Sequence, residues 1–402
     1  MKTTYKTILI ALALCWVGTS CTPEDDLRPN AEEAIVPAHI TDSVYHEEAK
    51  MMAYNFVYPS KDPFGKDVML SATITLNDEV TRQSPARGLI LYNHFTVYQA
   101  DQCPTHGDLL MQKLMAPGKL ITISPDYYGF GSTEEYPQAY CISRANAQSS
   151  VDALLAAKHL LDSMGYAWGD YLFNIGYSQG AQTAMGVVRL VDESYPDISI
   201  SHTFAGAGPY DIPETYRQFL SSTITGMPST VVSVLLSYNE YFQLNIPREA
   251  MFVEPLLSHI DEWVLSKKYT REEIDSKIGS QVIGDYLNSA LFDTNSHNSQ
   301  LLLQAMNSDN LCHGWTPRND ERIYLFHNTL DITVPVANTT NLYQFLSRQG
   351  LNNVILDTAD YGSSPLMPAH ETGAAPFIIR STDIMCQMLG VTPWISPQPT
   401  VW

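Results

Sequence analysis

Basic residues are scarce in this sequence. Its 402 residues include 23 lysines and arginines against 43 aspartates and glutamates, which gives a formal net charge of −20. Such an acidic chain repels the phosphates of nucleic acids and the headgroups of anionic membranes. Neither is therefore an expected partner through surface charge.

Several patterns that carry chemistry in other proteins are also missing. The sequence has no Cys/His spacing typical of a metal site and no glycine-rich phosphate-binding loop, so we expect neither a metal nor another cofactor. It shows no internal repeat and no low-complexity tract. Hydrophobic residues make up 45% of the chain, as in an ordinary globular protein, and the length allows one large domain with an insertion, or two domains.

Cysteines are few, and two of the six lie within the first 21 residues. The other four are Cys103, Cys141, Cys312 and Cys386, which an exported protein could pair. Cys103 and Cys141 each follow a predicted core strand on the same rim of the sheet, so they are the favoured pair. Spacing alone leaves the connectivity open, and four buried free thiols are the alternative.

The N-terminus predicts a targeting signal rather than a part of the fold. Lys2 and Lys6 flank the start of the chain, and the apolar run at 8–17 is too short to span a bilayer. The segment Gly18-Thr-Ser-Cys21 follows and resembles a bacterial lipoprotein signal, although Gly18 stands where such signals usually carry Leu. The acidic run after Cys21 resembles the surface-export signal of Bacteroidetes lipoproteins.

These features predict a signal peptide at 1–20, lipidation of Cys21, and a polar tether at 21–45. Removal of 1–20 would leave a formal charge of 21 − 43 = −22. The protein is then expected at the bacterial outer membrane, held by its lipid, with exposure on the cell surface left open. A plain secretory signal with a solvated acidic linker is the alternative.

Short apolar runs alternate with helical segments along most of the chain. This alternation predicts an α/β fold with a doubly wound, mainly parallel sheet, formed by 46–211 and 318–402. The β-branched segment 68–76 predicts an antiparallel strand at the sheet edge, and 45–57 is a candidate first helix. Further strands are predicted at 88–92, 120–124, 171–175, 198–204, 323–326 and 353–356, and further helices at 147–161, 336–348 and 374–389.

Residues 212–317 break the alternation. About a hundred residues between two core strands cannot be a loop, and Thr270-Arg-Glu-Glu273 is a capping box that opens a helix. We therefore expect a helical cap over the carboxyl edge of the sheet. Apolar cap residues should either face a pocket or only pack the cap against the core; the candidates are Val231, Leu235 and Phe252.

The most informative stretch is Gly176-Tyr-Ser-Gln-Gly180. It follows the apolar strand 171–175 and precedes a run with helical spacing, so it predicts a sharp strand–turn–helix with an exposed Ser178. Side chains at Gly176 or Gly180 would strike neighbouring backbone. Ser178 should then hold a strained backbone conformation above a helix N-terminus, which favours developing negative charge.

A serine nucleophile needs a base, and the base needs an orienting acid. The predicted base is His370, between the last strand and the final helix, and the predicted acid is Asp331, in a loop just beyond a strand. Asp357 and Asp360 are alternative acids, since they also lie between Ser178 and His370. Three other histidines, His297, His313 and His327, are interpreted as structural or surface residues, and Asp126 as a turn residue.

Taken together, these pieces resemble the α/β-hydrolases, in particular their capped, secretory-lipase-like or esterase branch. The matching segments are His94-Phe-Thr96, Pro125-Asp-Tyr-Tyr-Gly-Phe-Gly131, Gly176–Gly180, Asp331-Ile-Thr-Val-Pro335 and His370. The resemblance implies hydrolysis of carboxylic esters through an acyl-enzyme, with the triad order Ser, Asp, His. It also implies an oxyanion hole from the N–H groups of Gln179 and Thr96. Phe95 stands where the family usually has Gly, and His94 is interpreted as structural.

Two other functions remain compatible with the sequence. A capped serine aminopeptidase would use the same triad and would need an acidic anchor for the substrate amine, for which Glu240, Glu249 or Glu254 could serve. A binding lipoprotein could keep the fold without the chemistry, although the intact Ser, Asp, His order argues against it. The sequence does not fix the ester, whether small-molecule, lipid or glycan.

Overall fold

The structure is a computed structural model that describes residues 37–392, apart from 108, 116–117 and 365–366. The predicted signal peptide, Cys21 and most of the predicted tether lie outside the described residues. The described residues belong to one compact unit. Within the described residues, no helix is both long and apolar enough to cross a membrane.

The first two elements correct the sequence-based expectations. The end of the predicted tether forms strand β1 (His39–His46), and the predicted helix at 45–57 is replaced by strand β2 (Met51–Lys61), which pairs antiparallel with β1. Burial alternates along β2, with Phe56 and Tyr58 facing the core. Period-two burial of aromatic side chains favours a strand once a partner strand is available.

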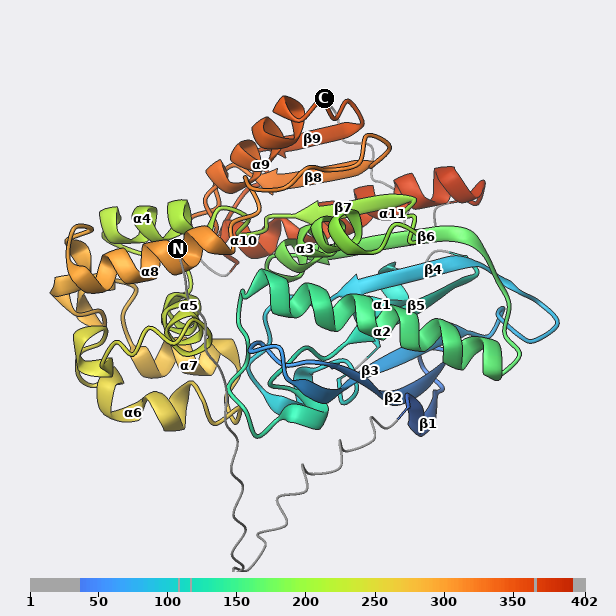
Figure 1. Ribbon diagram of the computed structural model, residues 1–402, viewed down its shortest axis with the longest axis horizontal. Helices are drawn as coiled ribbons and strands as arrows, with labels where there is room; N and C mark the ends of the chain where they lie inside the picture. The colour runs from blue at the N-terminus through green and yellow to red at the C-terminus, as the bar shows by residue number, and fades with distance from the viewer. Residues whose placement is uncertain (1–36, 108, 116–117, 365–366, 393–402) are drawn as a thin grey trace, which may run out of the picture. The chain divides into compact units, whose positions relative to one another are not determined.

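A nine-stranded sheet runs through the molecule in the order β1-β2-β3-β5-β4-β6-β7-β8-β9 (Figure 1). Pairing is antiparallel from β1 to β5 and parallel from β5 to β9, which confirms the mainly parallel, doubly wound α/β fold. β3 is antiparallel as predicted, but β1 and β2 lie outside it, so it is not the edge. The bounds are β3 (Asp67–Asn77), β4 (Ala86–Asn93), β5 (Leu120–Pro125), β6 (Trp168–Tyr177), β7 (His202–Gly206), β8 (Ile323–Asn328) and β9 (Val354–Ala359).

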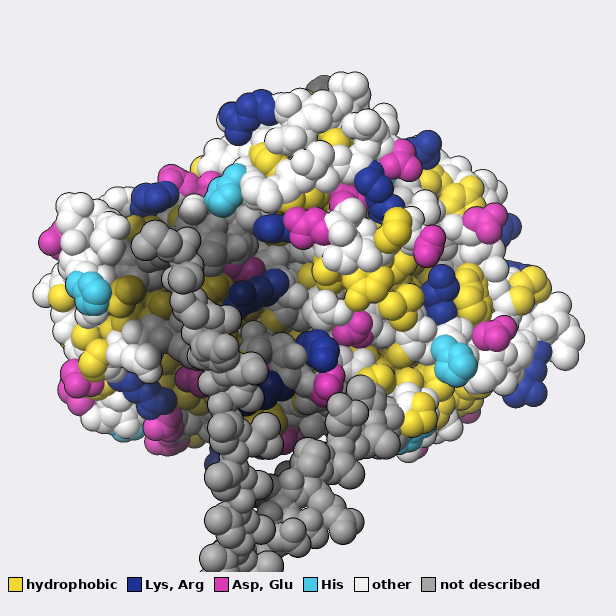
Figure 2. Space-filling model, in the orientation of Figure 1, with side chains coloured by type: hydrophobic (Ala, Val, Ile, Leu, Met, Phe, Trp, Pro, Cys, Tyr) yellow, Lys and Arg dark blue, Asp and Glu magenta, His cyan; other side chains and the backbone are white. Residues whose placement is uncertain are grey.

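Helices cover both faces of the sheet (Figure 1). Alternate residues of the central strands point to opposite faces, as in β4, where Leu89 and Leu91 join one hydrophobic cluster and Ile90 and Tyr92 the other. The first cluster packs under α2 (Ser143–Ser163), α3 (Gln179–Ser194) and α9 (Ala337–Arg348), and the second under α11 (Ala374–Leu389), beside α1 (Leu110–Met115). On the outer surface, acidic and basic side chains are scattered over the face shown in Figure 2.

Between β7 and β8 the chain is helical, as predicted for 212–317. The helices are α4 (Ile212–Ser221), α5 (Pro228–Tyr241), α6 (Leu256–Trp263), α7 (Arg271–Ile278) and α8 (His297–Ser308), with short 3-10 turns between α5 and α6 and between α7 and α8. The predicted capping box is present at the start of α7, where Thr270 and Glu273 each accept a hydrogen bond from the other's backbone N–H. Figure 1 shows these helices grouped beside the carboxyl ends of the central strands.

The insertion is joined to the core through a buried carboxylate. Asp309, just after α8, accepts hydrogen bonds from the backbone N–H groups of Ser143 and Arg144 at 2.6 and 3.2 Å. These groups open α2 and lack partners within that helix, so Asp309 caps it. Tyr238 of α5 reaches the same place, where its hydroxyl donates to the Cys141 carbonyl and to Asp309, at 3.2 Å each.

Candidate active site

The turn between β6 and α3 has the geometry that the glycine pattern predicts. Ser178 has φ 56° and ψ −124°, a conformation that a non-glycine residue adopts only under strain. A Cβ on Gly176 would lie 2.0 Å from the Gly180 carbonyl oxygen, and one on Gly180 would lie 2.1 Å from that of Asn93. Both contacts are with backbone, so only glycine fits at either position. The half-buried Ser178 side chain is thereby held at the carboxyl end of the sheet.

The structure brings the three predicted site residues into one hydrogen-bonded chain. Nε2 of His370 lies 2.8 Å from Oγ of Ser178, and Nδ1 lies 2.5 Å from Oδ2 of Asp331. A carboxylate can only accept, so Nδ1 carries the proton and Nε2 is free to accept from the serine hydroxyl. His370 lies on the short helix α10 (Ala369–Thr372), between β9 and α11, and is buried.

The alternative acids are placed elsewhere. The carboxylate of Asp357 accepts hydrogen bonds from the hydroxyls of Tyr324 and Tyr361 and pairs with Arg380 at 3.2 Å. Asp360 accepts from the backbone N–H of Gly362. Neither is hydrogen-bonded to His370, so the geometry favours Asp331.

The surroundings of Asp331 keep it ionised. Its Oδ1 accepts from the backbone N–H groups of Thr333 and Val334 at 2.8 and 2.9 Å. Burial by itself would raise the pKa of Asp331, but the charge of His370 and the hydrogen bond from His327 outweigh it and hold this pKa well below its usual range. A carboxylate that stays charged can orient the imidazole and stabilise its protonated form.

His327 lies behind this acid, at the end of β8, and is fully buried. Its Nε2 lies 2.8 Å from the Val334 carbonyl oxygen and 3.4 Å from Oδ2 of Asp331, and its Nδ1 lies 2.6 Å from the Thr339 hydroxyl. Because a carbonyl can only accept, Nε2 carries a proton that also faces the carboxylate. The structural interpretation of His327 therefore holds, with the addition that it supports the loop of Asp331.

The sequence pattern did not predict a role for Asn328. Its side-chain amide donates to the carbonyls of Gly362 and Ala369 at 2.9 Å, and its oxygen accepts from the backbone N–H groups of Leu330 and Tyr361 at 3.2 Å. Ala369 immediately precedes His370, and Leu330 immediately precedes Asp331. This buried side chain thus ties the acid loop to the helix of the base. The only signal in the sequence is a polar residue at a strand end, which is too common to be diagnostic.

The loop after β4 lies against the turn that carries Ser178. A Cβ on Gly180 would lie 2.1 Å from the Asn93 carbonyl oxygen and 2.8 Å from that of His94, so this loop runs close to the start of α3. No hydrogen bond from the Gln179 N–H is present among the described residues, and the Thr96 hydroxyl lies 3.0 Å from that of Tyr140. The N–H groups of Gln179 and Thr96 remain the predicted oxyanion donors.

Two other residues of this region are structural. The ring nitrogens of His94 lie 2.7 Å from the Phe95 carbonyl and 3.1 Å from that of Asp126, and burial lowers the His94 pKa. Asp126 is more than a turn residue, because its buried carboxylate accepts from the hydroxyls of Ser71 and Thr105 at 2.6 Å each. It joins the loop after β5 to β3.

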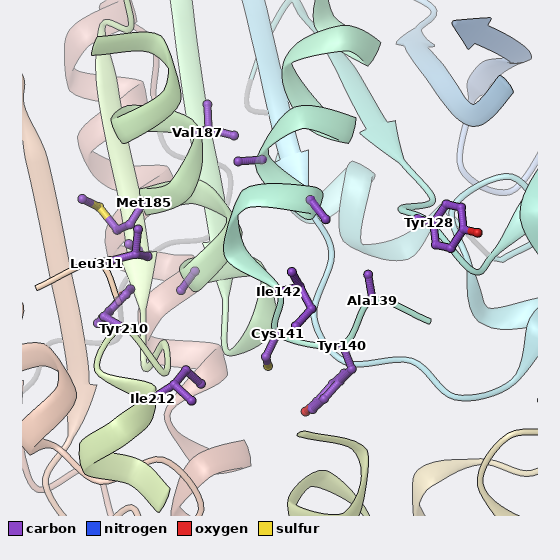
Figure 3. Packing of buried hydrophobic residues seen from close by; sticks show 14 of the residues in the cluster. Tyr128, Ala139, Tyr140, Cys141, Ile142, Met185, Val187, Tyr210, Ile212 and Leu311 are labelled. Atoms are coloured by element: carbon purple, nitrogen blue, oxygen red, sulfur yellow. The ribbon is translucent and has the colours of Figure 1, made fainter. Parts of the chain in front are cut away.

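A narrow cavity of about 30 Å³ adjoins Ser178. Its walls come from the segment before α2, from α4 and α5 of the insertion, and from the acid loop. Figure 3 shows Tyr140 and Cys141 extending toward the side where Ile212 lies, and all three line the cavity. Of the two alternatives left open for these residues, Val231 and Leu235 follow the first and line the cavity. Phe252 does not, because it bridges to Leu287 inside the insertion.

The expected pairing of Cys103 with Cys141 is wrong. All four cysteines of the described residues are free thiols. Cys103 packs with Val97 and Phe130 and lies 3.3 Å from Nδ1 of His106, whereas Cys141 faces the cavity beside Ser178. The two therefore occupy separate clusters. Within the described residues, no group of His, Cys, Asp or Glu side chains could hold a metal ion.

The comparisons identify the family. Residues 102–369, more than half of the chain, match the secretory lipase family. The protein belongs to the secretory lipase family. It is therefore an enzyme, an α/β-hydrolase of the esterase and lipase type, and the family implies ester or lipid substrates and suggests export. No curated protein matches the sequence of this secretory lipase.

Solved structures share the fold of this secretory lipase at low identity. A protein of Legionella pneumophila superposes with a TM-score of 0.74 at 18% identity, covering 88% of this chain and 97% of that one. The rice cell wall degrading esterase LipA from Xanthomonas oryzae gives 0.70 at 16%, covering 89% and 97%. The closed state of Candida antarctica lipase A gives 0.64 at 13%, covering 90% and 83%. Likeness at this identity establishes the fold alone.

Proposed function

We propose that this member of the secretory lipase family is an exported serine esterase that hydrolyses carboxylic esters through an acyl-enzyme on Ser178. The observation that carries the proposal is the unbroken chain of hydrogen bonds from Ser178 through His370 to Asp331. A hydroxyl, a base that accepts its proton and an ionised acid that orients the base are the parts that nucleophilic acyl transfer requires.

In the first half-reaction, Oγ of Ser178 attacks the ester carbonyl carbon while Nε2 of His370 takes the hydroxyl proton. The resulting oxyanion is stabilised by the N–H groups of Gln179 and Thr96. The tetrahedral intermediate then collapses, the bond to the alcohol oxygen breaks, and His370 gives its proton to that oxygen. In the second half-reaction, water attacks the carbonyl carbon of the acyl-enzyme while His370 takes a proton from the water. The bond to Oγ of Ser178 then breaks, His370 returns the proton to that oxygen, and the acid and free Ser178 are released.

The helical insertion, 212–317, is proposed to cap this site. Its helices α4 and α5 supply most of the cavity wall beside Ser178, so they lie where they can exclude water from the acyl group. The aminopeptidase alternative is less well supported. Among the described residues that line the cavity there is no carboxylate. The residues predicted to anchor the substrate amine of an aminopeptidase are exposed: Glu240, Glu249 and Glu254.

The test of the nucleophile is Ser178→Ala. Loss of the hydroxyl should lower kcat by about 10⁶-fold, as expected when the nucleophile or the base of a triad is removed. The melting temperature should be unchanged or higher, since the strained turn carries no packed side chain at this position. Kinetics on aryl esters with a purified variant would measure both. Near-normal turnover by Ser178→Ala would refute the proposal.

Anchoring is proposed separately. If Cys21 is lipidated at the start of the predicted tether, the enzyme should stay with the outer-membrane fraction and Cys21→Ala should release active, soluble enzyme. Cys15→Ala is the matched control, because Leu14 before it is too large for the small residue that a lipoprotein signal needs. Membrane association that persists in Cys21→Ala would exclude this anchor.

A further inference from the structure

The size of the cavity beside Ser178 limits what it can hold. At about 30 Å³, it has room for about two or three water-sized groups, since one water needs roughly 10–15 Å³ by the same measure. An acetyl or butyryl chain meets this limit, and a chain of eight carbons exceeds it. The walls would have to move to admit a longer group.

The walls are held in place by close packing. Phe219 of α4 and Val231 and Leu235 of α5 are all buried, so their side chains cannot swing into solvent to enlarge the cavity. The start of α5 is fixed by Asp275, whose carboxylate accepts from the backbone N–H of Ser229 at 2.8 Å. Asp275 is itself paired with Arg271 at 2.9 Å. A close-packed interior of this kind resists expansion by even a few methylenes.

The cavity also presents mainly carbon. The hydroxyls of Thr215 and Thr230 donate to the backbone carbonyls of Asp211 and Met227 at 3.2 and 2.7 Å, and that of Tyr140 is engaged with Thr96. Thr333 is an exception among the described lining residues, because its buried hydroxyl has no hydrogen-bond partner. Such a surface favours an aliphatic group over a polar one.

We propose that the cavity is the acyl site and that it restricts the enzyme to esters of short aliphatic acids of about two to four carbons. The acyl group remains bonded to Ser178 after the alcohol has left, and the cavity is lined by Ser178 itself, so the cavity is assigned to the acyl group and not to the alcohol. This inference rests on the proposed function of Ser178 as the nucleophile.

The experiment compares kcat/KM for p-nitrophenyl acetate, butyrate, octanoate and palmitate with the mature enzyme. We expect a drop of about 100-fold or more between butyrate and octanoate, because four methylenes find no room. Equal or faster turnover of octanoate or palmitate would overturn the inference. If that turnover is abolished in Ser178→Ala, the proposed function survives; if it is retained, the proposed function fails as well.

Substitutions in the cavity wall test which residues set the limit on acyl-chain length. Phe219→Ala and Leu235→Ala should each raise the octanoate-to-butyrate ratio by about 10-fold or more, since each removes part of the wall. Leu236→Ala is the matched control: Leu236 is half-buried on the same helix and does not line the cavity, so the ratio should not change. If Leu235→Ala does not fold, Val231→Ala makes a smaller opening. A ratio unchanged in all the folded wall variants, or raised as much in Leu236→Ala, would contradict the proposal.

Discussion

At the scale of single residues, the site depends on one ionised acid in a buried position. Asp331 has a pKa well below its usual range because His370 and His327 outweigh the effect of burial. The acid therefore remains charged throughout the pH range in which the imidazole can act as a base. A charged acid selects the tautomer in which Nε2 faces Ser178.

Asp331→Asn should lower kcat about 10⁴-fold, because an amide can hold the imidazole in the wrong tautomer. Asp360→Asn is the control, since Asp360 only accepts from a backbone N–H, as an Asn oxygen also can. Kinetics at neutral pH on both variants would measure this. Equal losses in the two, or full activity of Asp331→Asn, would show that Asp331 is not the orienting acid.

The carboxyl of Asp331 also contributes to the free energy of unfolding, and this contribution depends on pH. Its pKa is lower in the folded than in the unfolded protein, so the unfolded state binds the extra proton on acidification. The contribution is present above the unfolded pKa of about 4 and is lost as pH falls below it. Unfolding of the wild type should consequently show a steeper loss of stability in acid than unfolding of Asp331→Asn.

At the scale of elements, the residues of the site lie on two loops and one short helix, and these must stay in fixed positions relative to one another. Asp331 follows β8, His370 lies on α10, and Ser178 sits between β6 and α3. The hydroxyl of Tyr177 donates to the His370 carbonyl at 2.6 Å, which ties α10 to the turn of Ser178. Asn328 ties it to the acid loop. These buried polar links set the distances on which the proposed proton transfer would depend.

Asn328→Ala should lower kcat by about 10- to 100-fold with little change in KM, because misplacement of the base weakens catalysis more than ester binding. Asn341→Ala is a matched control: its amide donates to Asp211, away from the acid loop. Stopped-flow or steady-state kinetics on folded variants would separate kcat from KM. A rise in KM alone would assign Asn328 to substrate binding instead.

At the scale of the whole molecule, a partly buried cluster of charges outside the triad makes the free energy of unfolding depend on pH. Arg318 lies 2.7 Å from Asp192 at the end of α3 and 3.5 Å from Glu321 just before β8. One oxygen of Glu321 is buried without a partner. Burial, together with the charge of Asp192, raises the pKa of Glu321 to about 8.

Because this folded pKa lies above the unfolded one, the folded state holds the extra proton between about pH 5 and 8, and stability falls as pH rises through that window. Glu321→Gln should remove this pH dependence. The free energy of unfolding of the variant, relative to that of the wild type, should therefore rise by about 1–3 kcal/mol from pH 5 to pH 8.5. Urea unfolding at the two pH values would measure the gain. Glu193→Gln, which changes an exposed side chain of α3, should show no such rise. If the free energy of unfolding changes with pH equally in Glu321→Gln and in the wild type, Glu321 is not the group responsible.

The sequence by itself determined the features that depend on neighbours along the chain. The turn at 176–180 was predictable because its two glycines and its flanking strand and helix are local. The capping box at Thr270 and the parallel central strands were predictable for the same reason. The chain order Ser178, Asp331, His370 came from the resemblance to the α/β-hydrolases, and the strand-end position of Asp331 favoured it over the other candidate acids, because the carboxyl ends of parallel strands meet at one edge of the sheet.

Only the tertiary structure decided the features that depend on partners distant in sequence. β1 and β2 form strands because β3 offers an edge to pair with, which local pattern did not reveal in 39–57. Cys103 and Cys141 remain apart because their loops pack into different clusters. Asn328 joins two loops that the sequence separates by about forty residues, and Phe219, not Phe252, reaches the cavity. In each case side-chain packing and hydrogen bonding across the fold, which no local pattern encodes, made the choice.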